Sequence, residues 1–528
     1  MKDELSYLLG RTARGQISRR AFMGRAAALG VSAALANTML AQAVRAEGPK
    51  KGGLIRLGMA GGESTNSLDP ALAASEVPMQ VSFTWGEMLV DVNADGSINY
   101  RLAEEVSSSP DAKEWKFKIR KGVEFHNGKT VTAEDVVETL KRHTDEKSKS
   151  GALGIVQGIS EMKADGDMVT LTLKDANADL PYLMADYHLM IQPGGGFDNP
   201  AAGIGAGPYK ITVNEPGVRY GFEKFANYFD DTIGHADQIE ILVINDGTAR
   251  SAALQSGQVH MINRLDPKII ELLKRSPGVR IESVPGRGHY VFIMRTQTEP
   301  FLNNDLRMAL KYAVNRKEMV EKILGGYGHV GNDFPINSAY PLFDDTIEQR
   351  EYDPEKAKEY YKKSGHDGSP IILDTAPGAF PGAVEAAQLF QESAKACGIP
   401  LEIKRDPDDG YWSDVWNKAP FCASYWGGRP VQDQMYTTAY LSTADWNDTQ
   451  FQNEKFDSLL LAARGELDAT KRKAMYSEMA HLVRDEGGVI VPMFNDFLSG
   501  VSDQIQGWEA DPNQELMNGR AQVRCWLA

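Results

Sequence analysis

The residues best suited to bind a charged molecule lie together in the run Ser-Tyr-Trp-Gly-Gly-Arg-Pro-Val-Gln-Asp, at residues 424–433. Arg429 follows a pair of glycines, and its planar guanidinium suits a carboxylate, a phosphate or another anionic group. Tyr425 and Trp426 precede it and are expected to contact the same ligand. A structural alternative stays open, in which Arg429 pairs with a neighbouring carboxylate and Trp426 packs in the core.

Two short glycine motifs match nucleotide-binding patterns only in part. Residues 326–331 read G-x-G-x-x-G, but they follow a predicted helix at 315–324 and not a strand, so these glycines are expected to end the helix and form a loop. Residues 127–130 read Asn-Gly-Lys-Thr, like the end of a P-loop, yet Val123 stands where the first glycine must be. The sequence therefore predicts no nucleotide cofactor.

Metal and nucleophile motifs are also incomplete. Residues 91–96 begin like a calcium-binding loop, but Leu102 occupies the position of the bidentate carboxylate, so a hairpin turn is expected. The nine histidines are scattered, and the nearest pair, His126 and His143, lacks the spacing of a zinc site. The sequence contains no G-x-S-x-G motif. We therefore predict no catalytic residue, no metal ion and no cofactor.

Apolar patterning predicts an α/β protein. Strands are expected at residues 54–58 and 115–120. The segments 239–244, 248–256 and 259–262 have the patterns of strand, helix and strand, a βαβ unit that requires parallel pairing. Residues that can cap further helices are Thr132, Asn315 and Asp353.

The composition is that of a globular chain with excess negative charge. The 528 residues include 57 Lys and Arg against 72 Asp and Glu, and 42% are hydrophobic. Such a length suggests about three domains or large lobes. The first 46 residues carry a charge of +5, so the rest carries −20 and is expected to repel nucleic acid. Three cysteines, Cys397, Cys422 and Cys525, exclude a disulfide scaffold and leave one bridge open.

The N-terminal 46 residues are expected to be an export signal that is cleaved near Ala46. A basic start, a weakly apolar middle and small residues at the end follow the order of such a signal. Arg19, Arg20 and Phe22 resemble the twin-arginine motif, which predicts export by the twin-arginine translocase. A membrane anchor is the alternative, but the stretch at 26–43 is barely long enough and too weakly apolar.

Four segments, in order along the chain, are similar to bacterial extracellular solute-binding proteins of family 5, the dipeptide- and oligopeptide-binding group that serves ABC importers. They are WKFKIRKGVEFHNGKTVTAEDVV at residues 115–137, GAGPYK at 205–210, the D-L-R-x-A-L-x-Y-A-V-N-R pattern within 301–326, and YDPEKAKEYYKKSG at 352–365. The resemblance extends from about residue 53 to residue 507, nearly the whole chain after the signal.

This resemblance implies an α/β fold of the type II-like periplasmic binding proteins, in the large peptide-binding subclass. Two lobes would close over a ligand in the cleft between them. Residues 47–294 are expected to form most of lobe I, 295–495 lobe II, and 496–528 the C-terminal return to lobe I. The crossings between the lobes are expected near 290–295 and 490–496.

The family's peptide signature is altered at one position. Its peptide binders typically hold the ligand's amino group with an Asp four residues before a Pro, and Trp426 stands at that position before Pro430. Asp433 is expected to substitute in part, and Trp412 aligns with a position that often lines the pocket, unless it packs in the core. This departure puts dipeptides and ordinary oligopeptides in doubt and favours a peptide-like solute with an anionic group.

Three residues near the N-terminus complete the expected ligand contacts. Asn66 and Ser67 follow the first strand, where loops of α/β lobes face the cleft, with a plain turn as the alternative. Trp85 lies in the next apolar segment, with burial in the core as its alternative.

The combined interpretation is a periplasmic and monomeric substrate-binding component of an ABC importer. It is expected to capture a small-molecule or peptide ligand and to deliver it to the permease and its ATPase. We expect neither enzymatic activity nor nucleic acid binding. A secreted hydrolase or transferase that uses the interlobe cleft is the alternative, which parallel assays of turnover and binding would test.

Overall fold

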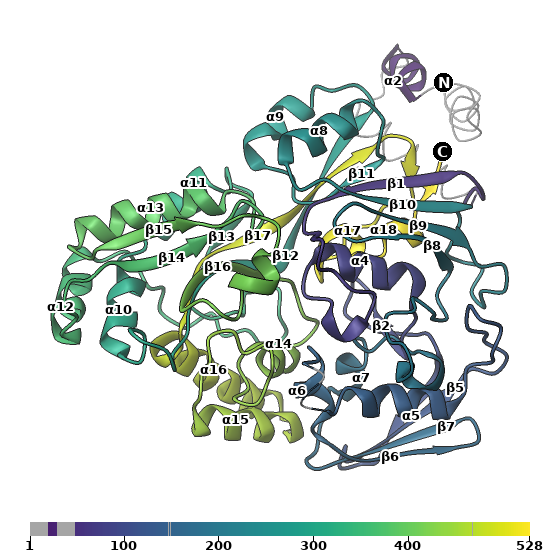
Figure 1. Cartoon of the computed structure of the whole chain (residues 1–528), viewed down its shortest axis with the longest axis horizontal. Helices are drawn as coiled ribbons and strands as arrows, with labels where there is room; N and C mark the ends of the chain where they lie inside the picture. The colour runs from purple at the N-terminus through teal and green to yellow at the C-terminus, as the bar shows by residue number, and fades with distance from the viewer. Residues whose placement is uncertain (1–18, 29–47, 146, 148, 467) are drawn as a thin grey trace.

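The computed structural model describes residues 19–28, 48–145, 147, 149–466 and 468–528. A mixed sheet of eleven strands runs through these residues (Figure 1). Its strands, in spatial order, are β15 (Leu401–Arg405), β14 (Ile371–Thr375), β16 (Phe421–Trp426), β12 (Val279–Met294), β17 (Val489–Ser502), β11 (Met261–Ile262), β1 (Leu54–Met59), β10 (Gln238–Val243), β9 (Arg219–Lys224) and β8 (Tyr209–Glu215), with β13 (Gly328–Val330) paired to β17.

The predicted βαβ unit is present and confirms the α/β class. Strand β1 pairs in parallel with both β10 and β11, and α8 (Gly247–Gln255) connects these two outer strands. The second strand is shorter than predicted, because only Met261 and Ile262 pair with β1. A second difference lies in the glycine-rich run at 326–331, where part of the expected loop forms β13.

A four-stranded antiparallel sheet forms the outer part of the N-terminal segment. Its order is β4 (Ala103–Ser108), β5 (Glu114–Ile119), β7 (Met168–Leu173) and β6 (Ile159–Asp165). Helix α5 (Ala133–Arg142) packs on this sheet and begins with the predicted cap, since Thr132 and Asp135 form a reciprocal capping box. The hairpin of β2 (Val90–Val92) and β3 (Ile98–Tyr100) contains the turn expected in place of a calcium loop.

Helices cover the remaining strands. Asn315 and Asp353 cap their helices as predicted, each accepting a hydrogen bond from a backbone N–H of the first turn. The α-helices between β12 and β17 are α10 (Asn304–Tyr312), α11 (Arg316–Lys322), α12 (Pro354–Ser364), α13 (Ala383–Ala396), α14 (Gln432–Ala439), α15 (Glu454–Gly465) and α16 (Ala469–Glu486). Those packed with the N-terminal segment include α4 (Glu76–Trp85), α6 (Leu153–Val156), α7 (Leu180–Leu183), α9 (Ile270–Leu273), α17 (Glu515–Gly519) and α18 (Ala521–Arg524), and β18 (Ile505–Gln506) pairs with β19 (Trp526–Leu527).

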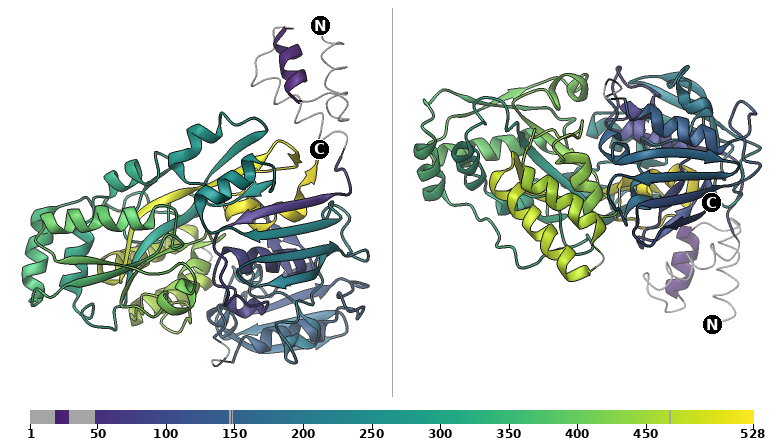
Figure 2. Two further views of the ribbon diagram at one scale, coloured as in Figure 1. Left: turned by 45° about the horizontal axis from the view of Figure 1, so that its top comes forward. Right: turned by 90° about the horizontal axis from the view of Figure 1, so that it is seen from below.

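Two long strands connect the two sides of the molecule. β12 and β17 pair antiparallel over most of their length, and Figure 2 shows the segment around 300–490 lying to one side, with the C-terminal residues returning to the other. Their register shifts between Pro285 and His289, where a side chain at Gly286 or Gly288 would collide with Phe497. We keep the terms lobe I (47–294 and 496–528) and lobe II (295–495) for the predicted segments.

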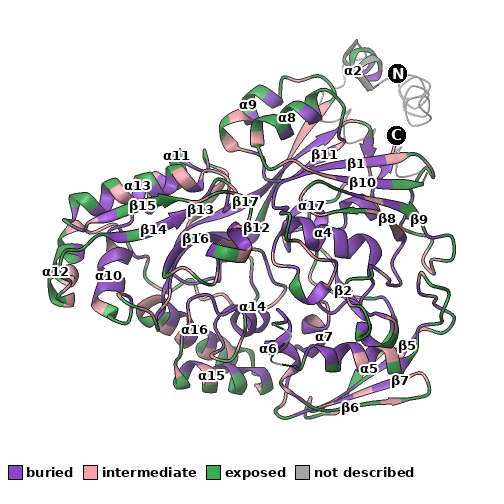
Figure 3. Ribbon diagram, viewed as in Figure 1, coloured by how far each residue is buried: buried purple, intermediate pink, exposed green. Residues whose placement is uncertain are grey.

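The buried residues form several apolar clusters. Figure 3 shows the central strands buried and the outer helices exposed on one face. The largest cluster holds the apolar residues of lobe II and continues into lobe I through residues such as Met79, Phe83 and Tyr187. Separate clusters underlie the β4–β7 sheet and the β1–β10 region. The three cysteines are buried and free. The bridge that the sequence left open is therefore not formed.

The predicted signal falls partly within the described residues. Arg19 and Arg20 begin α2 (Arg19–Ala28), and Phe22 is buried. The expected cleavage position near Ala46 lies outside the described residues. Among the described residues, no helix is both long enough and apolar enough to cross a membrane.

Candidate ligand-binding site

Aromatic and charged side chains from both lobes enclose a small pocket. Lobe I contributes residues from α4, from the loop before it and from two later segments, and lobe II contributes the end of β16 and its neighbours. The lining residues are Ala74, Glu76, Met79, Tyr187, Trp412, Trp416, Tyr425, Trp426, Gly427, Arg429, Trp446 and Gln514. The space inside is only about 30 Å³, close to the volume of one water molecule, so the walls must separate to admit a solute.

Four tryptophans and two tyrosines form the walls of this pocket. Trp446 lies edge to face with Trp416 at a centroid distance of 5.3 Å and is tilted against Trp426 at 6.0 Å. Trp412 meets Tyr425 edge to face at 5.1 Å. These contacts make the walls a continuous aromatic cluster, which offers large apolar faces to a ligand.

Asp448 holds two of the indoles from behind. Its Oδ2 accepts hydrogen bonds from Nε1 of Trp416 at 3.0 Å and of Trp426 at 3.2 Å. Burial raises the pKa of this carboxyl to about 7, although the two indole hydrogen bonds act in the opposite direction. Because both N–H groups are engaged by Asp448, Trp416 and Trp426 have no N–H left for a ligand.

Arg429 is buried, 4% exposed, and poorly satisfied by the rest of the chain. Its Nη1 donates to the carbonyl of Gly428 at 3.0 Å, and its Nε has no hydrogen-bond partner among the described residues. No carboxylate oxygen of the described chain lies within 4.0 Å of its nitrogens. Burial lowers its pKa, but nearby Tyr187 and Asp186 outweigh that effect and raise it, so the guanidinium remains charged. The predicted alternative, an ion pair within lobe II, is not formed.

A second charged cluster lies at the lobe I wall. The Arg264 guanidinium lies 3.6 Å from Glu76 and 3.9 Å from Glu515, and stacks on the Tyr425 ring at 3.9 Å. Burial and the charge of Glu76 raise the pKa of Glu515 to about 8, and burial also raises the pKa of Glu76. Two carboxylates thus share one guanidinium, which favours a retained proton.

Comparison with known proteins places the chain in a family. The sequence profile of bacterial extracellular solute-binding proteins, family 5, matches residues 97–448. The chain belongs to this family. Glutathione-binding protein GsiB of Salmonella choleraesuis is 23% identical over 86% of this chain and 91% of its own length.

Solved structures share the fold of this family 5 protein. AgaA of A. tumefaciens in complex with agropinic acid has a TM-score of 0.81 at 24% identity, covering 90% of this chain and 99% of that one. The periplasmic binding protein DppA of Helicobacter pylori, in complex with the peptide STSA, has a TM-score of 0.82 at 19% identity, with 90% and 98% covered. The fold is therefore that of the type II-like periplasmic peptide-binding proteins. The family consists of solute-binding proteins of ABC importers, so the protein is not an enzyme and the hydrolase or transferase alternative is set aside.

Four of the predicted site residues come together in the pocket of this family 5 protein. Arg429, Trp426, Trp412 and Tyr425 all line it. Asp433 does not, because α14 turns its carboxylate toward Arg464, whose Nε donates to it at 2.7 Å. Its charge is already balanced, so it offers no free carboxylate for a ligand amine.

The three N-terminal residues that were predicted to contact the ligand lie outside the pocket lining. Asn66 accepts a hydrogen bond from the Glu63 backbone and Ser67 accepts one from the Asp69 backbone, so both serve a local turn. Trp85 is fully buried in the core of lobe I.

The loop that carries Asn66 nevertheless reaches lobe II through its neighbours. Glu63 accepts a hydrogen bond from the backbone N–H of Trp412 at 2.9 Å. Ser64 donates to Asp409 from both its backbone N–H, at 3.1 Å, and its hydroxyl, at 3.0 Å. This loop therefore contacts lobe II through Glu63 and Ser64, whereas Asn66 and Ser67 stabilise its turn.

Several lining residues were missed in the sequence. Trp416 lies four residues after Trp412, a spacing that could have suggested a shared face, and the π-helix at Tyr411–Val415 brings both to the pocket. Glu76, Tyr187 and Trp446 come from segments far apart in the chain, and no local pattern marks them.

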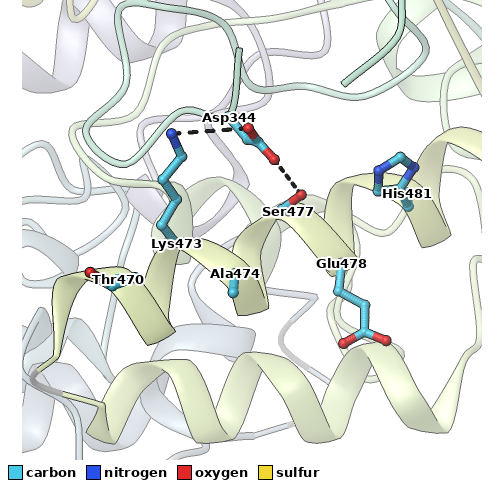
Figure 4. A pocket seen from close by; sticks show the side chains of 7 residues that line it. All are labelled: Asp344, Thr470, Lys473, Ala474, Ser477, Glu478 and His481. Carbon is cyan, nitrogen blue, oxygen red and sulfur yellow. Dashed lines mark hydrogen bonds and ion pairs between the residues drawn. The ribbon is translucent and has the colours of Figure 1, made fainter. Parts of the chain in front are cut away.

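A larger hollow of about 600 Å³ lies on the surface of α16 and shares no residue with the aromatic pocket. Figure 4 shows its side chains on that helix and Asp344 on a loop beside it. Ser477 donates to Asp344 at 2.6 Å, and Lys473 lies 4.0 Å from the same carboxylate. Lys473 and Glu478 are well exposed. These contacts describe a solvated surface, and the described residues contain no group of three or more His, Cys, Asp or Glu that could hold a metal ion.

Proposed function

We propose that this family 5 protein is the periplasmic receptor of an ABC importer for a small peptide-like solute that carries an anionic group. The anionic group binds Arg429, and the body of the solute lies between the tryptophans. The lobes close over it, and the permease accepts the closed form. The ligands named for the relatives, glutathione, agropinic acid and a peptide, support this chemical range.

The observation that carries the proposal is the buried guanidinium of Arg429, which has an unused Nε donor and no carboxylate of the described chain within 4.0 Å. Nearby Tyr187 and Asp186 keep it charged, and a ligand anion in direct contact would add the ion pair that the described chain does not form. The other side of the proposal is the loss of the amine-binding carboxylate, because Trp426 stands at its position and Asp433 is paired with Arg464. An anion is therefore the group that Arg429 recognises, and neither Trp426 nor Asp433 offers a free carboxylate to a peptide amine.

The proposal is tested by identifying the solute that copurifies with the protein. Wild type, Arg429→Ala and Arg405→Ala are purified in parallel, denatured, and the released small molecules are quantified by mass spectrometry. Arg405 is exposed, so its removal subtracts the same charge without touching the pocket. We expect one anionic solute to accompany wild type and the control and to be depleted from Arg429→Ala. Equal recovery from all three proteins would contradict the proposal.

We further propose that the chain is exported by the twin-arginine route and acts as a monomer. The proposal is supported by the Arg-Arg-x-Phe run at residues 19–22. Replacing Arg19 and Arg20 by Lys is expected to leave unprocessed precursor in the cytoplasm. Normal amounts of processed protein in the periplasm of that double variant would point to a different route.

A further inference from the structure

The four tryptophans of the pocket have no Lys or Arg stacked on them among the described residues. Arg264 stacks on Tyr425, and Arg429 lies 5.8 Å from the ring centre of Tyr187. Both tyrosine walls are thus already used by guanidinium groups of the chain. In the part of the chain that the structure describes, no Lys or Arg lies over any of the four indoles, although an indole is the best aromatic partner for a cation.

Asp448 makes two of these indoles better partners for a cation. A carboxylate oxygen that accepts an N–H draws the proton toward itself and leaves more electron density on the ring. Asp448 does so to Trp416 and Trp426 with one and the same oxygen. Glu76 adds a carboxyl group to the lobe I wall, within electrostatic reach of Arg429. The indoles bound by Asp448 are therefore the surface of the pocket that suits a positive charge.

The same geometry selects the kind of cation. A primary ammonium has three N–H donors that each need an acceptor, whereas indole nitrogens are donors only. The Nε1 atoms of Trp416 and Trp426 already point at Asp448, and Glu76 is engaged by Arg264. An ammonium whose hydrogens are replaced by methyl groups requires no acceptor and gains from aromatic faces on several sides.

We propose that the ligand is a zwitterion whose N-methylated ammonium is enclosed by Trp412, Trp416, Trp426 and Trp446 and whose carboxylate binds Arg429. This inference rests on the proposed function, because it takes the anionic group at Arg429 as given and adds the opposite end of the solute. It names the substrate class as betaine-like amino acid derivatives. The space of about 30 Å³ implies that the tryptophans separate when such a group enters.

Matched pairs of ligands test the effect of the positive charge while the shape of the bulky end stays the same. The full-length chain, freed of bound solute by unfolding and refolding, is titrated by calorimetry with N,N,N-trimethylglycine and with 4-(trimethylammonio)butyrate. Each is compared with the carboxylate in which carbon replaces the nitrogen, so that the bulky end is an uncharged tert-butyl group: 3,3-dimethylbutyrate and 5,5-dimethylhexanoate. All four carry the carboxylate, so only the charge of the bulky end differs. Since four of the eight tryptophans line the pocket, tryptophan fluorescence provides a second readout.

We expect at least one trimethylammonium compound to bind about tenfold or more tightly than the matching tert-butyl carboxylate. Trp446→Leu, which keeps an apolar wall, should reduce that preference to about threefold or less, whereas Trp508→Leu outside the pocket should leave it unchanged. Equal affinity within a pair, or no binding by any trimethylammonium compound, would overturn the inference.

The titrations distinguish a failure of the cation site from a failure of the anion site. If both members of a pair bind equally and both depend on Arg429, the cation site is wrong and the anion site stands. If the trimethylammonium compound is preferred but Arg429→Ala binds it as well as wild type does, the anion site of the proposed function is wrong, and the zwitterion with it.

Discussion

Two buried arginine sites in lobe II differ in how the charge of the guanidinium is compensated. Arg316 and Arg350 converge on Asp333, with N–O distances of 2.6 and 2.7 Å, and Arg350 also reaches Asp485 at 2.5 Å. Arg429 is buried to the same degree, donates to the Gly428 carbonyl and is influenced by Tyr187 and Asp186, but no carboxylate of the described chain lies within 4.0 Å of it. The charge of the first site is balanced by direct ion pairs. The second site has no direct ion pair, and this is the difference that we expect between a structural ion cluster and a binding site.

The lack of a nearby carboxylate does not by itself identify a buried arginine as a binding residue. Arg250 also lacks a carboxylate within 4.0 Å among the described residues, yet it donates to four backbone carbonyls. Its donors are therefore used, and it fixes the chain between β10 and β11. Arg429 combines burial, unused donors and a position on a pocket wall, and this combination carries the functional proposal.

The largest loss of stability is expected when the carboxylate of Asp333 is removed from the cluster with Arg316 and Arg350. Asp333→Asn removes the charge that both guanidinium groups face and leaves two buried cations uncompensated. We expect a loss of about 3–5 kcal/mol in the free energy of unfolding, measured by urea titration. Asp345→Asn, at an exposed position, is the matched control and should change stability by less than about 0.5 kcal/mol. A loss below about 1 kcal/mol at Asp333 would show that the cluster is not structural.

The next effect concerns the carboxylates that share Arg264. The pKa of Glu515 is raised to about 8, above its value in an unfolded chain, so the folded state keeps a proton that the unfolded state has released. Stability from this group is therefore present at low pH and is lost as the pH rises toward 8. Glu515→Gln should be more stable than wild type at pH 8, by on the order of 2 kcal/mol, and show no such gain at pH 4. Parallel pH profiles of melting temperature for both proteins would contradict the raised pKa.

The smallest effect on stability is expected at Arg429 itself. Arg429→Met replaces an unpaired buried charge with an apolar side chain of similar length. The ligand-free protein should therefore keep its free energy of unfolding within about 1 kcal/mol, or gain a little, because a desolvated charge is removed without stranding a partner. A loss as large as that of Asp333→Asn would mean that Arg429 is part of the structural network.

The sequence was informative wherever structure is local. The capping residues Thr132, Asn315 and Asp353 act within one helical turn, so their side chains and their helices could be predicted together. The same holds for β1, β5 and the βαβ unit, whose apolar patterns are contiguous. Arg429 and Trp426 could be selected because the family's peptide signature changes at that point.

The remainder of the site depends on long-range folding. Glu76, Tyr187 and Trp446 line one pocket although they are spread over more than three hundred residues of sequence. No local pattern distinguishes them from residues that are buried for structural reasons. Asp433 has the right residue type near the right motif, but the direction of α14 turns it toward Arg464. Residue type identified the chemistry, and only the fold decides which side chains share a pocket.

The most direct test of the account is a crystal structure of the protein with its copurified solute. We predict a closed pocket with an anionic oxygen of the solute at about 2.7–2.9 Å from the Arg429 guanidinium, and with the tryptophans separated around the rest of the molecule. A solute whose anionic group lies elsewhere, while Arg429 still contacts only the Gly428 carbonyl, would contradict the claim that the ligand supplies the missing counter-charge.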